Sequence, residues 1–436
     1  MRDFFLATLL FFLLPGALIR CQWGVLLWYW ISMMNPHRLA YGFIFSFPFG
    51  KWITALSMLS FFWSEKRMIP LNRLTGFWFC WIVWLTISTV FALLPEMAWW
   101  QWNKIMKIML FSALTIMVMQ KKYDLHALLW VIVGSIIFYG IKGGLFTLFT
   151  LGHYHVYGPP TSFIADNNTL AMALLMTLPL LYYLLNTQAH RIIRQFGFAA
   201  MLLSVFAVLG SQSRGGLVTL IGLSAFVLWK IQAKWQSMLL VGISVPLVGL
   251  FLPDAWFARM ETIIHYEQDL SALGRINAWW FAWRLALDRP LVGGGLEVFK
   301  PAFFEQYAPN PVDYHDSHSI YFEVLAAHGF IGLFFYMMTL WSAWRMSVHL
   351  QGQAGWIAQL AVAIQCSLVA YMIGGTFLGV AYFDMYYALL SILVILSIHA
   401  GSVVPVNTKP PYQALQRFVF KKSVPMGAYK VERTND

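Results

Sequence analysis

The stretch Tyr314 to Gly332 reads YHDSHSIYFEVLAAHGFIG and joins a polar loop to a long apolar run. Its first part carries two histidines, an acid and two serines. We expect a membrane helix that begins just before His318, so that His318 lies just inside it, with Asp316 and Ser317 as candidate N-caps, because short polar side chains accept hydrogen bonds from the first backbone N–H groups of a helix. An imidazole titrates near neutral pH, so one at a helix mouth on a membrane surface suits chemistry on a lipid-borne substrate.

The composition indicates an all-α polytopic membrane protein. Of the 436 residues, 60% are hydrophobic and only 11% are charged, whereas soluble globular proteins carry roughly 25% charged residues. The 36 Phe and 21 Trp fit a helical bundle with aromatic belts at both membrane surfaces. The formal net charge of +11 fits Lys and Arg in cytoplasmic loops. We therefore expect membrane lipids as partners and no nucleic acid.

Thirteen apolar segments follow one another along the chain and predict about 12–13 transmembrane helices. The lower number applies if the first two segments form one broken span. The segments are Phe4–Ile19, Gln22–Met34, Phe49–Trp63, Leu74–Leu94, Trp100–Met119, Leu125–Phe149, Thr169–Leu185, Phe196–Gly210, Gly216–Trp229, Ser237–Leu252, Ser319–Trp344, Ile357–Val380 and Met385–Ile398.

The positive charges orient these segments. The tail after His399 is rich in Lys and Arg, which favours the cytoplasmic side. Counting back from the tail puts the other basic stretches on the same side; they contain Arg345, Lys230, Lys234, Arg191, Arg194, Lys121, Lys122, Lys66, Arg67 and Arg73. We therefore divide the chain into an N-terminal helix bundle (residues 1–252), one large non-cytoplasmic loop (253–317), C-terminal transmembrane helices (318–400) and a basic cytoplasmic tail (401–436).

The large loop holds nine acidic and five basic residues, a balance that fits the non-cytoplasmic side. Within it, Leu270–Asp288 has a helical pattern, with Trp279, Trp280 and Trp283 beside Arg275 and Arg284. We interpret this segment as a helix lying on or dipping into the membrane interface.

Two arginines are candidates for binding an anion on that side. Arg214, in SQSRGG, stands between two apolar segments, where a charge must pair or face water. The alternative is an arginine that reaches out to the membrane surface from a helix end. Arg275 follows Gly274, and a guanidinium can hold a pyrophosphate through paired hydrogen bonds. A solvated face of an interfacial helix is the alternative for Arg275, and it is favoured for Arg284.

Polar residues in or beside the apolar segments form a second group of candidates. Lys107, one turn from Lys104, and Lys142 lie toward the non-cytoplasmic ends of their segments. Lysines inside membrane segments are rare and often functional, although a long side chain can also reach the surface. Asn168, in the run Asp166 to Asn168, is either a substrate contact or part of an N-cap cluster.

For the chemistry itself, His318 is the candidate general base, and His315 is an equally polar neighbour. The sequence has no glycine-rich nucleotide loop, no zinc-ligand spacing and no serine-hydrolase elbow. It also lacks the paired Asp motif expected of a metal-dependent glycosyltransferase. We therefore expect no bound metal, no cofactor and metal-independent chemistry.

Several motifs resemble those of one bacterial family. His318-Ser319, followed by Gly329 and Gly332, is similar to the H-[NSQ]-x9-G-x-x-[GTY] signature of O-antigen ligases. SRGG around Arg214 and the GR-x3-W of Gly274, Arg275 and Trp279 resemble other landmarks of that superfamily, which extends to O-antigen polymerases. Further stretches are similar to O-glycosylation ligases associated with exosortase systems; they are MNPHRLAYGF from Met33, IKGG from Ile141 and GPPTSFIADNN from Gly158.

The resemblance implies about a dozen transmembrane helices with one large periplasmic loop, in the bacterial inner membrane. It implies transfer of a glycan from undecaprenyl pyrophosphate to an acceptor hydroxyl, with inversion at the anomeric carbon. Arg214 and Arg275 would bind the pyrophosphate, and His318 would be the base. Asn168, Ser319, His315 and Arg284 are expected as further substrate contacts. Lys107 and Lys142 are added to them for their charge within apolar segments and not from the resemblance.

The acceptor is open between a protein hydroxyl, the lipid A core and a growing glycan chain. A protein acceptor fits the exosortase-linked subgroup, whereas the others correspond to a ligase and a polymerase. A transporter or flippase of lipid-linked glycans is the alternative from another class. Transporters place charged residues near the membrane midplane, whereas here the polar residues gather at one face.

Overall fold

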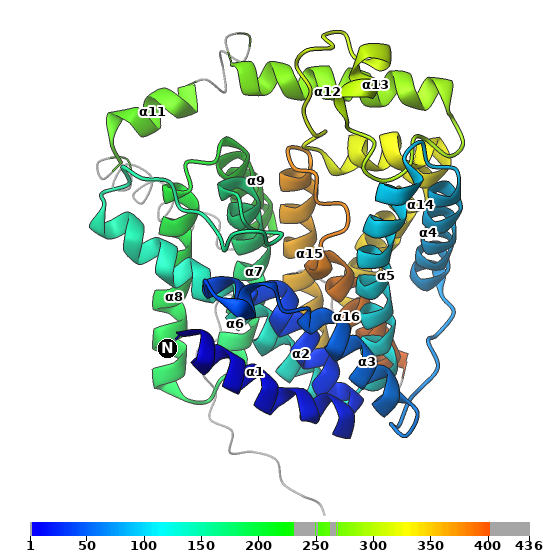
Figure 1. Cartoon of the computed structure of the whole chain (residues 1–436). Helices are drawn as coiled ribbons and strands as arrows, with labels where there is room; N and C mark the ends of the chain where they lie inside the picture. The colour runs from blue at the N-terminus through cyan, green and yellow to red at the C-terminus, as the bar shows by residue number, and fades with distance from the viewer. Residues whose placement is uncertain (1, 231–248, 250–251, 262–266, 268, 402–436) are drawn as a thin grey trace, which may run out of the picture.

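A computed structural model describes residues 2–230, 249, 252–261, 267 and 269–401 (Figure 1). This part of the chain contains helices and no strands, which confirms the all-α class. The helices are α1 (Arg2–Ile19), α2 (Cys21–Met34), η1 (Pro36–Leu39), η2 (Phe43–Ser46), α3 (Phe49–Phe61), α4 (Arg73–Val90), α5 (Pro95–Val118), α6 (Lys122–Phe149), α7 (Asn167–Thr187), α8 (Arg191–Gly210), α9 (Arg214–Lys230), α11 (Asp254–Glu261), α12 (Leu270–Asp288), α13 (Pro301–Tyr307), α14 (Ile320–Leu350), α15 (Trp356–Gly375) and α16 (Asp384–Gly401).

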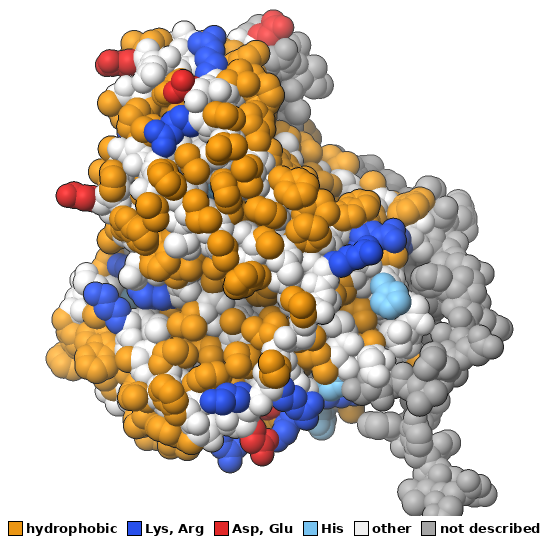
Figure 2. Space-filling view, turned by 90° about the vertical axis from the view of Figure 1, so that its right-hand side faces the viewer, with side chains coloured by type: hydrophobic (Ala, Val, Ile, Leu, Met, Phe, Trp, Pro, Cys, Tyr) orange, Lys and Arg blue, Asp and Glu red, His pale blue; other side chains and the backbone are white. Residues whose placement is uncertain are grey.

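Seven of the described helices are long and apolar enough to cross a membrane: α4, α6, α7, α8, α14, α15 and α16. Of these, α7, α15 and α16 are mostly buried and form the centre, whereas α4 and α8 expose most of their side chains. Figure 2 shows one flank of the molecule covered largely by hydrophobic side chains, as expected of a lipid-facing surface. The chain is therefore a polytopic membrane protein.

The predicted count of 12–13 spans stays a prediction. The first apolar stretch forms two helices, α1 and α2, which separate at Arg20, where the backbone is extended. The shorter helices α2, α3 and α9 pack into the same bundle. Most of the predicted segment Ser237–Leu252 lies outside the described residues, as does the basic tail after Gly401.

One end of the bundle, which we call the basic end, is where α5, α9, α14 and α16 finish and α6, α8 and α15 begin. Direct contacts join these termini: His399 Nε2 lies 2.7 Å from the Gln120 carbonyl oxygen, and the Lys122 ammonium lies over the Trp356 ring. The Lys230 ammonium donates to the side chain of Gln351 at 2.9 Å. Lys122 and Lys230, from two of the basic stretches that the sequence assigns to one side of the membrane, thus lie at the same end of the structure.

The opposite end, which we call the site end, carries the large loop. Helices α11, α12 and α13 lie across it in Figure 1. The predicted interfacial helix Leu270–Asp288 is present as α12, and α13 packs on it through stacked rings of Phe281 and Phe304, whose centroids are 4.4 Å apart. The Asn277 amide donates to the carbonyls of Asn310 and Asp313 at 2.8 and 2.7 Å, which fixes the chain that leads to His318.

Helix α14 is broken where the sequence predicts one continuous span. Gly329 has φ 66°, a left-handed conformation that residues with a Cβ rarely adopt. The break frees backbone groups, and the segment 290–295 pairs with them: Phe330 N donates to the Pro290 carbonyl at 2.9 Å, and Gly294 N donates to the Ala326 carbonyl at 2.8 Å. Gly329 is therefore required for its conformation as well as for close packing.

Candidate functional site

His318 occupies a constrained loop immediately before α14. The helix begins at Ile320 with Ser319 as its N-cap, so the expectation that Asp316 or Ser317 caps it and that His318 lies inside it is wrong. The physical reason is the backbone of His318, whose φ of 41° is left-handed and cannot continue into a helix. A non-glycine residue held in that region is a feature typical of functional sites.

Trp279 holds this loop in place. Its indole Nε1 donates to the Ser317 carbonyl oxygen at 2.8 Å, and its ring stacks on Phe322 with centroids 5.1 Å apart. Trp279 stands four residues after Arg275 on α12, and residues at that spacing share a helix face. The GR-x3-W motif therefore places Arg275 and Trp279, whose indole fixes the His318 loop, on the same side of α12.

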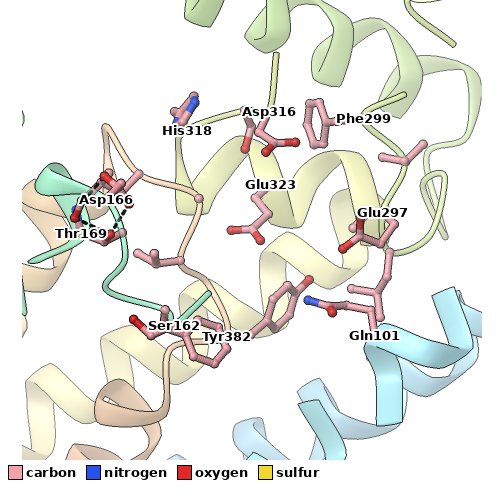
Figure 3. Close-up of a pocket in the computed structure, with 18 residues that line it drawn as sticks. Gln101, Ser162, Asp166, Thr169, Glu297, Phe299, Asp316, His318, Glu323 and Tyr382 are labelled. Carbon is pink, nitrogen blue, oxygen red and sulfur yellow. Dashed lines mark hydrogen bonds between the residues drawn. The ribbon is translucent and has the colours of Figure 1, made fainter. Parts of the chain in front are cut away.

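A cavity of about 380 Å³ opens beside His318. Four acidic residues line it, namely Asp166, Glu297, Asp316 and Glu323, and they come from four different segments. Figure 3 shows the carboxylates of Asp316, Glu323 and Glu297 directed at one space. Its lining also includes Gln101, Ser162, Phe163, Thr169, Leu296, Val298, Phe299, Ser317, Ala327, Leu378, Gly379, Val380 and Tyr382.

The surroundings of His318 favour its neutral form. Burial lowers the pKa of His318 below its ordinary value, and the positive charge of Arg275 lowers it further. The carboxylates of Asp316 and Asp166 oppose this effect and raise the pKa. A neutral imidazole can accept a proton, and the neighbouring carboxylates stabilise the imidazolium that results.

Arg275 lies close enough to both His318 and Arg214 for their charges to interact. Burial lowers the pKa of Arg275, and the charge of Arg214 adds to this, while Asp269 and Asp166 act in the opposite direction. The buried Arg275 Nε has no hydrogen-bond partner among the described residues. Gly274 makes room beside it, because a Cβ at that position would lie 2.8 Å from the His315 ring. The predicted residues Arg275 and His315 thus approach His318 from α12 and from its own loop.

Arg214 begins α9 and pairs with the carboxylate of Asp269, the N-cap of α12. The loop before it is fixed by α7: the Asn167 amide donates to the Ser211 carbonyl at 2.8 Å, and the Ser213 hydroxyl donates to Asn168 Oδ1 at 2.6 Å. Asn168 therefore shapes the Arg214 loop, and it is not part of the cavity lining. The half-buried ion pair shows that the Arg214 guanidinium can accommodate an anion at this position.

The other predicted contacts lie at different distances from this centre. Ser319 is buried, and its hydroxyl has no partner among the described residues. Arg284 is exposed and reaches the Tyr307 carbonyl at 3.5 Å, on the far part of α12. Lys142 is exposed on α6, and Lys107 lies near Lys51; neither lines the cavity. The structure therefore brings His318, His315, Ser319, Arg275 and Arg214 together and leaves Lys107, Lys142 and Arg284 outside.

Sequence reasoning missed several residues of the cavity. Asp316 was considered only as a cap, and Glu323 follows Ser319 by four residues, a spacing that places it on the same helix face. Asp166 caps α7 through Asn168 N and Thr169 N while its carboxylate also lines the cavity. Tyr382 comes from the connection between α15 and α16, and no sequence pattern signals it.

A second, apolar cavity of about 430 Å³ lies on α12 beside Arg275. It is lined by Ile276, Trp279, Trp280, Trp283 and Phe322. Trp280 and Trp283 are exposed there. Tryptophan is favoured where protein meets the membrane interface, so this groove can hold a hydrocarbon chain next to a guanidinium.

Within the described ranges, no three His, Cys, Asp or Glu side chains are grouped so that they could hold a metal ion. Metal-independent chemistry stays a prediction.

Comparison with protein families gives two matches. Residues 199–337 match the family described as O-Antigen ligase, a segment that contains Arg214, Arg275 and His318. Residues 1–189 match a family of unknown function (DUF5935). No curated protein matches the sequence.

Proposed function

We propose that the chain transfers a glycan from undecaprenyl pyrophosphate to an acceptor hydroxyl at the periplasmic face of the inner membrane, and the O-antigen ligase match of residues 199–337 supports this proposal. The observation that carries the proposal is the meeting of His318, in a strained loop, with Arg275 and Arg214 at one end of a membrane bundle. The clustering of these groups at one end favours an enzyme over a transporter.

The donor belongs on the arginine side of His318. A pyrophosphate carries several negative charges, so the carboxylates of the 380 Å³ cavity would repel it, whereas Arg275 and Arg214 would bind it. Asp269 then has to release Arg214, and the pyrophosphate replaces its carboxylate. The tryptophan groove beside Arg275 suits the hydrocarbon part of the same lipid.

The acceptor belongs in the acid-lined cavity. Carboxylates and amides accept hydrogen bonds from hydroxyl groups, and they cannot repel an uncharged acceptor. His318 is one of the residues that line the cavity, which puts an acceptor bound there next to the proposed base.

The reaction then follows from these positions. The acceptor oxygen attacks the anomeric carbon and forms the new glycosidic bond while the bond from that carbon to the pyrophosphate oxygen breaks. The acceptor proton moves to His318, and Asp316 stabilises the imidazolium. Undecaprenyl pyrophosphate leaves with its charge held by the two arginines. A single displacement inverts the anomeric carbon and uses no metal ion.

For the acceptor we propose a protein hydroxyl, on the resemblance to the exosortase-associated O-glycosylation ligases. The lipid A core and a growing glycan are the other acceptors that the same site could serve. Mass spectrometry of the glycosylated product distinguishes them, since a glycopeptide, a glycosylated core lipid and an elongated glycan have different masses.

The test of the function uses purified protein in lipid nanodiscs with undecaprenyl-pyrophosphate-linked glycan and membranes that contain the native acceptor. We expect His318→Ala to lose about 10²–10⁴-fold in transfer rate, the usual contribution of a general base. The matched control is His126→Ala, which removes a histidine at the basic end and leaves transfer intact. Wild-type turnover by correctly inserted His318→Ala protein contradicts the proposed role.

A further inference from the structure

A buried hydrogen-bonded chain extends from the cavity into the bundle and is not used by the reaction above. His328 is fully buried in α14, one residue before the break at Gly329. Its Nε2 lies 2.6 Å from the Tyr382 hydroxyl, and its Nδ1 lies 2.5 Å from the Ser88 hydroxyl of α4. Tyr382 lines the cavity beside His318, so the chain Ser88–His328–Tyr382 ends at the acceptor side of the site.

The surroundings of Ser88 favour one direction for these hydrogen bonds. The Ser88 hydroxyl donates to the Leu85 carbonyl at 3.0 Å, and a carbonyl oxygen can only accept. Having given its proton to Leu85, Ser88 accepts from His328 Nδ1–H. In a neutral imidazole the other nitrogen then carries no proton, so His328 Nε2 accepts the phenol proton of Tyr382.

The consequence for the cavity is that Tyr382 presents only lone pairs to it. The phenol proton is committed to His328, so the Tyr382 oxygen can bind only a hydrogen-bond donor. Figure 3 shows the Tyr382 hydroxyl close to the side-chain amide of Gln101, whose buried Oε1 has no hydrogen-bond partner among the described residues. The Gln101 Oε1 therefore needs a donor from a ligand, and the Tyr382 oxygen can accept a further hydrogen bond.

We propose that Tyr382 binds a hydroxyl group of the acceptor, and that His328 and Ser88 are positioning residues that fix Tyr382 as a hydrogen-bond acceptor. This inference rests on the proposed function for the identity of the ligand as the acceptor substrate. The direction of the hydrogen-bonded chain is independent of it. The break at Gly329 contributes, because the His328 carbonyl is held by the Trp84 indole at 3.0 Å, which fixes the imidazole against α4.

The bundle offers a matched control. Tyr183 and His126 form a second Tyr–His pair, partly buried, with the Tyr183 hydroxyl 3.0 Å from His126 Nε2, at the basic end. Tyr183→Phe and His126→Gln thus remove the same kinds of group, far from the cavity.

The first experiment determines the tautomer of His328 by ¹⁵N NMR of histidine-labelled full-length protein in nanodiscs, with His328→Gln used for assignment. We expect the Nδ1–H tautomer and a changed Nε2 resonance in Tyr382→Phe protein. An Nε2–H tautomer, or an Nε2 resonance that is the same in wild-type and Tyr382→Phe protein, overturns the inference. If His328→Gln does not fold, Ser88→Ala serves for assignment, because it perturbs Nδ1 of the same ring.

The second experiment measures the rate at which labelled undecaprenyl-pyrophosphate glycan is consumed in membranes that carry the native acceptor. Tyr382→Phe is expected to lower the maximal rate about tenfold, the effect of one lost hydrogen bond, without changing the donor concentration for half-maximal rate. His328→Gln alone should lower the maximal rate several-fold. In the Tyr382→Phe background it should lower the rate no further, because His328 acts through the Tyr382 phenol. The two control variants should retain the wild-type rate.

Additive losses in the double variant, or a raised half-saturation concentration for the donor, contradict the positioning role of His328. If the wild-type protein consumes no donor, the proposed function fails, while the tautomer measurement still decides the direction of the chain.

Discussion

At the basic end of the bundle, two histidines have defined hydrogen-bond partners. His126 is held by Tyr183 and by the Lys122 carbonyl, and His399 by the Gln120 carbonyl. At the site end, His318 lies in a left-handed loop beside four carboxylates and within electrostatic range of Arg275. The two ends use the same residue types, and at the site end His318 lines the acid-lined cavity.

Backbone strain follows the same division. Six described residues with a side chain have a positive φ, and five of them lie in connections at the site end: Leu151, Thr161, Gln212, Glu297 and His318. The sixth, Asn35, ends α2. Each such conformation costs about 1–3 kcal/mol and persists only where the surroundings enforce it. The comparison teaches that most of this strain lies at the site end, where pre-organisation serves binding and chemistry, and that the basic end is organised for stability and orientation.

The largest difference between the two ends is expected in the transfer rate after an arginine is replaced by lysine. Arg275→Lys keeps the charge but loses the paired hydrogen bonds, and we expect about a 10²-fold loss of transfer, the size seen when one stabilising donor is removed. Arg191→Lys, an exposed change at the basic end, should leave the rate unchanged. Steady-state kinetics with lipid-linked glycan measures both, and equal rates for Arg275→Lys and wild type contradict the anion site.

Two glycines with positive φ should differ in how much their substitution lowers the free energy of unfolding. Gly329 and Gly355 both have positive φ, but a Cβ at Gly329 would lie 2.6 Å from the Pro290 carbonyl oxygen, whereas one at Gly355 would meet nothing within 4 Å. Gly355→Ala should lower the free energy of unfolding by the backbone strain alone, about 1–3 kcal/mol. Gly329→Ala should cost about 1–3 kcal/mol more, because atoms must move. Thermal unfolding in the same detergent compares them, and equal losses contradict the account of the α14 break.

Loss of the hydrogen bond from Trp279 to the His318 loop should have a smaller effect on the transfer rate. Trp279→Phe keeps an aromatic ring on Phe322 and leaves the Ser317 carbonyl without its donor. We expect a five- to tenfold loss of transfer, in line with about 1 kcal/mol for such a bond. Trp229→Phe, an exposed change at the basic end, is the control. If Trp279→Phe protein keeps the wild-type rate, the Trp279–Ser317 hydrogen bond has no role in positioning His318.

The smallest expected effect is a shift in pH dependence. A general base must be neutral, so transfer is lost as pH falls through the pKa of His318, and the lowered pKa puts that acid limb below the ordinary histidine value of 6.5. Asp316 raises this pKa, so Asp316→Asn should move the limb further down, by up to about one pH unit. Glu65→Gln at the basic end should not move it, and an upward shift for Asp316→Asn contradicts the assignment of His318 as the base.

The sequence supported the helical class, the grouping of basic termini and the interfacial helix α12 because hydropathy and charge are local properties. It also identified His318, Arg275 and Arg214, through motif spacing. It could not reveal the broken helix, because Gly329 reads as one small residue in an apolar run until the segment 290–295 is seen to pair with it. Tyr382 and His328 were out of reach for the same reason, since 54 residues separate them and only packing brings them together.

The most direct measurement of the central claim is an electron cryomicroscopy structure of the full-length protein with undecaprenyl pyrophosphate in nanodiscs. The account predicts the pyrophosphate in contact with Arg275 and Arg214, with Asp269 displaced, the lipid chain along the tryptophan groove and His318 facing the open cavity. A pyrophosphate bound at the basic end, or inside the acid-lined cavity away from both arginines, would contradict it.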